Sequence, residues 1–81
     1  MSEKIQVFVK TLTGKEFPLN VDPDETIDNV RKMIQAKEGI PPNQQVLVSM
    51  GSPVHSGTLR DNNIQKDGTI FLAIRLHGGH Y

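Results

Sequence analysis

The sequence contains no cysteine and no tryptophan, and aromatic residues make up only 5% of its 81 positions. Without cysteine, the chain has no disulfide framework, no thiolate metal site and no thiol nucleophile of its own. No apolar run approaches the ~20 residues that a membrane-spanning helix needs, and the polar stretch Met1 to Lys4 is unlike a secretory signal. The composition therefore predicts a small domain with one modest core and no membrane span.

Neither sign of charge is in excess, because nine Lys and Arg residues face nine Asp and Glu residues. Nucleic acids and anionic membranes both select proteins with a basic surplus, so neither is expected as a partner. A chain of this length buries only about 60% of the surface that it exposes when unfolded, which leaves no deep cleft for a substrate. These limits favour a protein that binds partners over one that catalyses a reaction.

Apolar and polar residues alternate over residues 5–10 and again over 16–21, which is the period of half-buried strands. Gly14 between them suits a hairpin loop. Pro18 has no N–H to donate, so the second strand is expected at a sheet edge with its nitrogen facing outward. Apolar residues at 27, 30 and 34 then follow helical spacing, with Thr26 as the N-cap and Gly39 as the residue that ends the helix.

The second half of the chain predicts a short strand over 46–50, a brief strand at Val54 and a final strand over 69–76. Between them, residues 58–65 suit a short helical turn that Thr58 caps. A hairpin followed by one helix and further strands predicts an α+β roll, in which one mixed sheet wraps on one main helix. We expect the first and last strands to pair in parallel at its centre.

A single helix covers only one face of a sheet, so the other face should stay open. If Leu47 and Leu72 face the core, strand alternation turns their neighbours outward. Together with the hairpin tip, these outward positions are Leu12, Val48, Phe71 and Ala73. Two interpretations remain open: ordinary scattered surface hydrophobes or a contiguous patch that binds a partner.

An enzyme would need a constellation of reactive groups. His55, Ser56 and Asp61 suggest a hydrolase site, but a histidine next to its serine in one short loop does not easily reach triad geometry. His77 and His80 are only two ligands for a metal, fewer than a structural or catalytic site requires. We therefore expect no catalytic residues, no metal and no cofactor.

Several separate motifs, in the same order, resemble the ubiquitin family. They are residues 9–15 (VKTLTGK), 37–42 (KEGIPP) with the glutamines 44 and 45, 63–66 (NIQK) and 75–79 (RLHGG). The similarity runs from Ile5 to Gly79 with one single-residue deletion between Ser52 and Thr58. It implies a β-grasp domain over residues 5–76, a polar extension over 1–4 and a flexible tail over 77–81.

The resemblance implies a protein modifier that is joined to target lysines through the carboxyl group of Gly79, beside Gly78, after a protease removes His80 and Tyr81. Its partners would be activating, conjugating and ligating enzymes, processing proteases and ubiquitin-binding receptor proteins. It would act as a monomer in the cytoplasm and nucleus. The segment that processing and activating enzymes recognise falls on Arg75, Leu76 and His77.

The resemblance also assigns two apolar surfaces and a set of lysines. The main patch consists of Leu12, Val48 and Ala73, with Phe71 at its edge, and the secondary patch consists of Ile40, Ile74 and Leu76. The candidate acceptor lysines for chains are Lys10, Lys15, Lys37 and Lys66.

The sequence departs from the family pattern at several functional positions. Ser52 replaces the lysine most used for degradative chains, and Arg31 and Met33 replace two helix lysines. His77 replaces the second arginine of the tail, and Asn62 replaces a tyrosine that ties down the preceding loop. A non-conjugated ubiquitin-like docking domain is the alternative function, although such a domain needs no Gly-Gly pair near its end.

Overall fold

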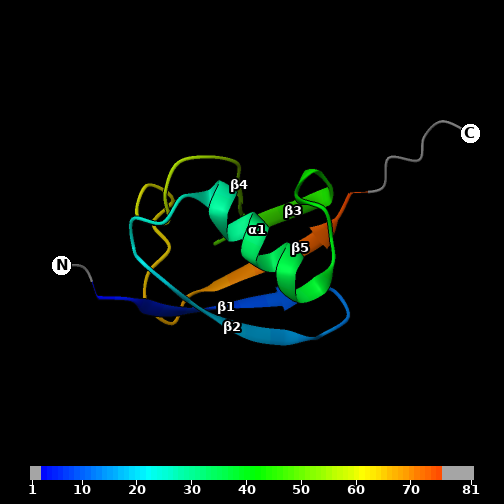
Figure 1. Ribbon diagram of the computed structural model, residues 1–81, viewed down its shortest axis with the longest axis horizontal. Coiled ribbons are helices and arrows are strands. Elements are labelled where there is room, and N and C mark those ends of the chain that lie inside the picture. Colours follow the sequence, from blue (N-terminus) through cyan, green and yellow to red (C-terminus); the bar gives the residue numbers. More distant parts are fainter. Residues whose placement is uncertain (1–2, 76–81) are drawn as a thin grey trace, which may run out of the picture.

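The computed structural model describes residues 3–75 and contains one five-stranded mixed sheet in the order β2-β1-β5-β3-β4 (Figure 1). The strands are β1 (Ile5–Thr11), β2 (Glu16–Val21), β3 (Gln45–Ser49), β4 (Ser52–Val54) and β5 (Thr69–Ile74). The central strands β1 and β5 are parallel, and the other neighbouring strands are antiparallel. The parallel central pair expected from the sequence is therefore confirmed.

Strand β2 lies at the edge of the sheet, as Pro18 requires. Pro18 is in register with Phe8, whose own amide donates to the carbonyl oxygen of Gly68 on the other side of β1 at 2.8 Å. Phe8 and Pro18 thus form a non-hydrogen-bonded pair of the antiparallel ladder. The missing N–H of Pro18 costs no bond within the sheet.

Helix α1 (Ile27–Glu38) begins and ends at the predicted residues. The Oγ1 atom of Thr26 accepts a hydrogen bond from the amide of Asn29 at 3.2 Å, which satisfies one of the free donors of the first turn. Gly39 adopts a left-handed conformation with φ 76°, and its amide donates to Gln35 O at 2.7 Å. A short 3₁₀ helix, η1 (Pro42–Gln44), then leads into β3.

The core lies between α1 and one face of the sheet, and α1 crosses that face in Figure 1. Side chains from the inward positions of the strands meet the apolar stripe of the helix there. Leu59 joins them from the turns after β4. The largest fully buried side chains of the core are Val7, Val9, Leu19, Val21, Ile27, Val30, Ile34, Leu47, Leu59, Ile70 and Leu72. The predicted α+β roll, a β-grasp arrangement of one mixed sheet on one main helix, is confirmed.

Residues 59–63 form consecutive turns where the sequence suggested a short helical turn over 58–65, and Thr58 forms an isolated bridge with Thr26. Thr58 does cap this segment, because its Oγ1 atom accepts from the amide of Asp61 at 3.0 Å. No helix develops, since Asn63 takes a left-handed conformation with φ 59° and the amide of Ile64 reaches back to Leu59 O at 2.9 Å. The final strand ends at Ile74, and its predicted end at Leu76 lies outside the described residues.

No helix within residues 3–75 is both long enough and apolar enough to cross a membrane.

Candidate interaction surface

The sheet face opposite α1 carries a row of apolar side chains set by strand register. Phe71 of β5 lies opposite Val48 of β3, and Ala73 lies opposite Val46. These residues alternate with the buried side chains of the same strands, so they point away from the core. Phe71 remains 46% exposed, whereas Val48 and Ala73 are half-buried.

The same row continues onto the neighbouring strands. Lys10 of β1 flanks Phe71 on one side, and Pro53 of β4 flanks Val48 on the other. One row further along, Phe8 lies opposite Thr69 and is half-buried on the open face. Phe8 and Pro53 are not among the predicted patch residues, although the alternation of Phe8 with the buried Val7 and Val9 indicates that Phe8 faces outward.

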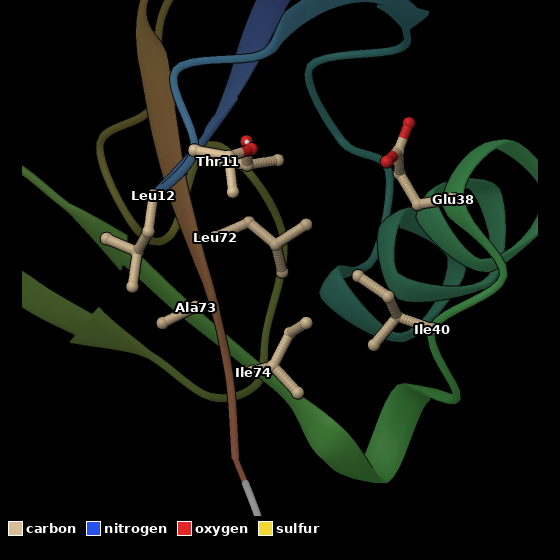
Figure 2. Close-up of a pocket in the computed structure, with 8 residues that line it drawn as sticks. Thr11, Leu12, Glu38, Ile40, Leu72, Ala73 and Ile74 are labelled. Carbon is tan, nitrogen blue, oxygen red and sulfur yellow. Dashed lines mark hydrogen bonds between the residues drawn. The ribbon is translucent and has the colours of Figure 1, made fainter.

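Leu12 is the most exposed large apolar residue in the described chain, at 81%. It extends from the tip of the β1–β2 hairpin and lines one hollow with Ala73 and Ile74. Figure 2 shows Leu12 and Ala73 on one side of β5, with Leu72 and Ile74 on the other. The structure thus brings Leu12 next to Ala73, while Val48 and Phe71 form a separate cross-strand pair on the same face.

The secondary patch lies beside the last residues of β5. Ile40, just beyond α1, faces Ile74 in Figure 2, and both line the hollow of about 390 Å³ that also contacts Leu12. Ile74 is 52% exposed. Leu76, the third predicted member of the secondary patch, lies outside the described residues.

An ion pair joins the hairpin to the end of the helix beside this hollow. Lys15 Nζ lies 2.9 Å from Glu38 Oε2, and the Glu38 side chain is only 14% exposed. Within the hairpin, the amide of Thr11 donates to Lys15 O and the amide of Gly14 donates to Thr11 O. These contacts connect the hairpin that carries Leu12 to the end of α1, next to Ile40.

The four candidate acceptor lysines are all exposed. Lys15 is engaged by Glu38, and Lys37 lies with its Nζ atom 6.0 Å from the ring centroid of Phe17, within reach of a cation–π interaction. Lys10 borders Phe71 on the open face. Lys32, which is not among the predicted acceptors, is also exposed on α1.

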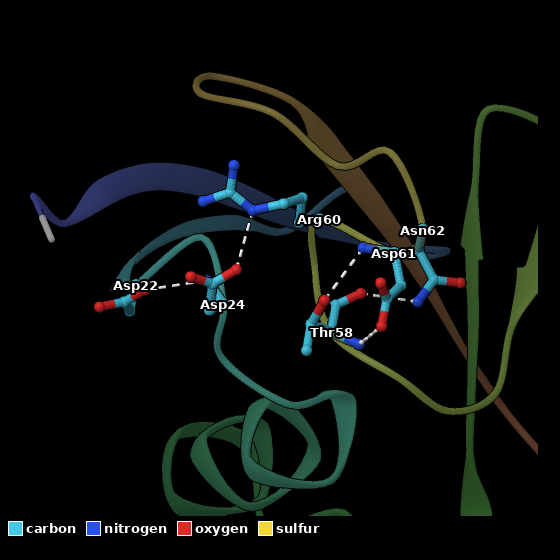
Figure 3. Close-up of polar contacts among 6 residues, drawn as sticks. All are labelled: Asp22, Asp24, Thr58, Arg60, Asp61 and Asn62. Atoms are coloured by element: carbon cyan, nitrogen blue, oxygen red, sulfur yellow. Dashed lines mark hydrogen bonds and ion pairs between the residues drawn. The ribbon is translucent and has the colours of Figure 1, made fainter.

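The side-chain amide of Asn62 bonds to the loop that precedes it. Its Nδ2 atom donates to Ser56 O at 2.9 Å and to Thr58 O at 2.8 Å, so one amide side chain ties the shortened loop. Figure 3 shows the contact with Thr58. Beside it, Arg60 Nε lies 2.8 Å from Asp24 Oδ1, and this hydrogen bond raises the pKa of the guanidinium above its ordinary value.

Among the groups considered for catalysis, Asp61 takes part in the local turn. The Asp61 Oδ2 atom accepts a hydrogen bond from the amide of Thr58 at 3.1 Å, which makes Asp61 part of a turn. Within residues 3–75, no group of three or more His, Asp or Glu side chains is placed to hold a metal ion. His77, Gly78, Gly79 and His80 lie outside the described residues.

Comparison with known proteins gives consistent matches along most of the chain. A sequence model described as the Ubiquitin family matches residues 7–77. Ubiquitin-like protein 1 of Schizosaccharomyces pombe is 36% identical over 72 residues, which are 88% of this chain and 92% of that protein. Ubiquitin-like protein NEDD8 of Dictyostelium discoideum is also 36% identical over 72 residues, covering 88% of this chain and 94% of that protein.

A third match has a different extent. The AN1-type zinc finger protein 4 of Mus musculus is 36% identical over 78 residues, which are 95% of this chain but only 11% of that protein. The chain is therefore similar both to nearly complete small proteins and to one segment of a much longer one.

Proposed function

The chain belongs to the ubiquitin family, and we propose that it is conjugated to lysines of target proteins through the carboxyl group of Gly79. Members of this family are protein tags and not enzymes, so the chain is a ubiquitin-like modifier. The observation that carries the proposal is the match to two small ubiquitin-like proteins over more than 90% of their length. The Gly78-Gly79 pair after Arg75 and Leu76 supports it.

The chemistry assigns the carboxyl group to this chain and the catalysis to its partners. Hydrolysis of the peptide bond between Gly79 and His80 leaves a free carboxylate on Gly79. ATP adenylates this carboxylate with release of pyrophosphate, and a partner's cysteine thiolate then displaces AMP to form a thioester. A lysine amine finally displaces the thiolate and forms the isopeptide bond. Because the chain has no cysteine, every thiol in this sequence of steps belongs to a partner.

The ubiquitin-like domain covers residues 5–76 in this proposal and the tail covers residues 77–81, of which 77–79 remain after processing to enter the active sites of the activating and conjugating enzymes. Glycine suits such a tail because it has no side chain to block a narrow channel. Arg75, Leu76 and His77 would be read by the processing and activating enzymes. Cytoplasm and nucleus are the compartments in which we place these reactions.

Receptors would bind the main patch on the open face of the sheet. Its members lie on β5, β3 and the hairpin tip, where Leu12 and Phe71 are exposed and Val48 and Ala73 are half-buried. Val48 and Ala73 are each smaller than the residues usual in the family, at a cost of about 0.8 kcal/mol per lost CH₂. The ring of Phe71 adds apolar area beside them. Enzymes that handle the tail would contact Ile40, Ile74 and Leu76, and chains would grow on Lys10, Lys15, Lys37 or Lys66.

Formation of an ATP-dependent thioester tests the proposal. The full chain is treated with a processing protease of the ubiquitin pathway, and its mass is measured for the loss of residues 80 and 81. The product is then mixed with an activating enzyme with and without ATP. We expect a thiol-sensitive adduct that forms only with ATP and that fails to form with the variant Gly79→Val. An unchanged mass after the protease, together with no adduct, would contradict conjugation through Gly79.

The second candidate function is a docking module that is never conjugated. The observation that favours it is the match to a segment that makes up 11% of a long zinc finger protein. Such a module would bind receptors through the same patch but would form no thioester. Binding of a receptor to the main patch, without formation of a thioester on Gly79, would therefore favour this alternative.

A further inference from the structure

We propose that a second site, apart from the main patch, binds one side-chain carboxylate of a partner protein. The site is an open hollow of about 390 Å³ between α1, the η1 segment and the residues that follow β4 and β5. Arg31, His55 and Arg75 line it from three different segments, together with the amide of Asn43 and the carboxylate of Asp28.

Arg31 is held rigidly at this hollow by backbone carbonyl groups. Its Nη1 atom donates to Gln45 O at 2.7 Å and, at a longer 3.5 Å, to Pro42 O, while its Nη2 atom donates to Val54 O at 3.0 Å. The side chain is half-buried. A guanidinium group fixed in this way loses little additional conformational entropy when it binds an anion.

Arg31 forms no ion pair within the described residues, although Asp28 lines the same hollow. The ion pairs found among residues 3–75 are Lys15 with Glu38 and Arg60 with Asp24, and Arg31 takes part in neither. Carbonyl oxygens satisfy its N–H groups but carry no net charge. A partly desolvated arginine without a carboxylate partner attracts an anion more strongly than a fully solvated one.

Backbone contacts place the other two basic residues beside Arg31. The guanidinium binds the carbonyl group of Val54, the residue directly before His55. The amide of Arg75 donates to Gln44 O at 2.7 Å, one residue before the carbonyl group that Arg31 binds. Both neighbours therefore start from backbone positions that the fold fixes.

The charge balance of the hollow selects the class of anion. Two arginines and one aspartate leave a single net positive charge before His55 is counted, in a chain whose overall charge is zero. One positive charge matches a carboxylate, which carries one negative charge, better than a phosphate group, which carries nearly two. A glutamate or aspartate side chain of a protein partner is thus the ligand that the hollow fits. Conjugation is not needed, because Gly79 and the main patch take no part in this site.

An NMR titration of the full chain tests this site with a defined probe, N-acetylglutamic acid α-amide, which carries one side-chain carboxylate. Inorganic phosphate and chloride serve as competing probes at matched ionic strength. We expect saturable shifts at Asn43, Gln45 and His55 with the carboxylate, and weaker or unsaturated shifts with the other two anions. Tighter binding of phosphate would overturn the choice of ligand, and equal shifts with chloride would overturn the site.

Three exposed positions give matched variants that leave the hydrogen bonds of Arg31 in place. Asp28→Asn removes the competing carboxylate and should tighten binding roughly two- to fivefold, the scale of exposed charge pairs. His55→Glu introduces a carboxylate into the hollow and should abolish saturable binding. Lys32→Gln removes an exposed positive charge of the same helix outside the hollow and should change nothing. If Lys32→Gln and His55→Glu lowered the affinity for the carboxylate probe equally, general charge attraction would explain the binding and the site would be refuted.

Discussion

Removing the ring of Phe71 should weaken receptor binding without unfolding the domain. Phe71 lies on the open face of the sheet opposite Val48, and 46% of its surface is exposed in the free chain. A receptor that covers the main patch would bury that exposed part. The variant Phe71→Ala removes this gain while it leaves the fully buried neighbours Ile70 and Leu72 in place.

The expected loss of binding free energy follows from the part of the Phe71 side chain that is exposed in the free chain. Full burial of a phenylalanine contributes about 1.5–3 kcal/mol, so covering roughly half of it contributes about 1 kcal/mol. This corresponds to an approximately fivefold rise in Kd. The free energy of unfolding should fall by no more than about 1 kcal/mol, the contribution of a cross-strand pair on an exposed face. Phe71→Asp should abolish measurable binding, because it places a charge in the apolar contact.

Isothermal titration calorimetry with a ubiquitin-binding receptor domain measures the Kd, and thermal unfolding measures stability. Ile74→Ala is the matched control, since Ile74 is similarly exposed, at 52%, but belongs to the opposite side of β5. We expect Ile74→Ala to leave the Kd unchanged. Equal losses for both variants, or persistent binding by Phe71→Asp, would refute the assignment of the open face as the receptor site.

The remaining predictions concern the loops that hold the domain together, and chemical denaturation measures each of them. Asn62→Ala removes two hydrogen bonds to the carbonyl groups of Ser56 and Thr58 and should lower the free energy of unfolding by about 1–3 kcal/mol; an unchanged midpoint would contradict its role as the tie. Thr26→Ala removes the N-cap of α1 and should lower the free energy of unfolding by about 1 kcal/mol, whereas Thr26→Ser keeps a hydroxyl group there and should retain most of this stability. Gly57→Ala should cost about 1 kcal/mol or more, because Gly57 has φ 87° and a Cβ atom there would lie 3.1 Å from Asp61 Oδ2; a neutral effect would mean that the loop relaxes.

Local chemistry made much of the fold predictable from the sequence. Thr26 and Gly39 mark the helix ends because each satisfies or permits a specific backbone geometry at its own position. Pro18 predicted that its strand lies at the edge of the sheet because proline has no N–H to donate to a second neighbour. Alternation along the strands also predicted that Phe71 and Val48 face outward, and their register confirms that they lie opposite one another.

Contacts between distant segments were not predictable in this way. Nothing in the sequence around Arg31 indicates that its guanidinium reaches the carbonyl groups of Gln45 and Val54, which lie 14 and 23 residues away. The substitution at Asn62 suggested an altered loop, but the two bonds by which its amide restores the tie depend on how the shortened loop folds back. Leu12 was predicted as exposed, while its position beside Ala73 and Ile74 required the three-dimensional path of the hairpin.

Conjugation through Gly79 is tested by identifying the peptide remnant that the chain leaves on target lysines after trypsin digestion. Trypsin cleaves after arginine, and the last arginine before Gly79 is Arg75, so a conjugated lysine should retain the sequence Leu-His-Gly-Gly on its amine. The measurement is mass spectrometry of tryptic peptides from cells that produce a tagged form of the full chain, with Gly79→Val as the control. We expect lysines with this four-residue branch in the wild-type sample and none in the control. Recovery of the intact chain with its partners but without any such branched peptide would contradict conjugation and leave the protein as a docking module.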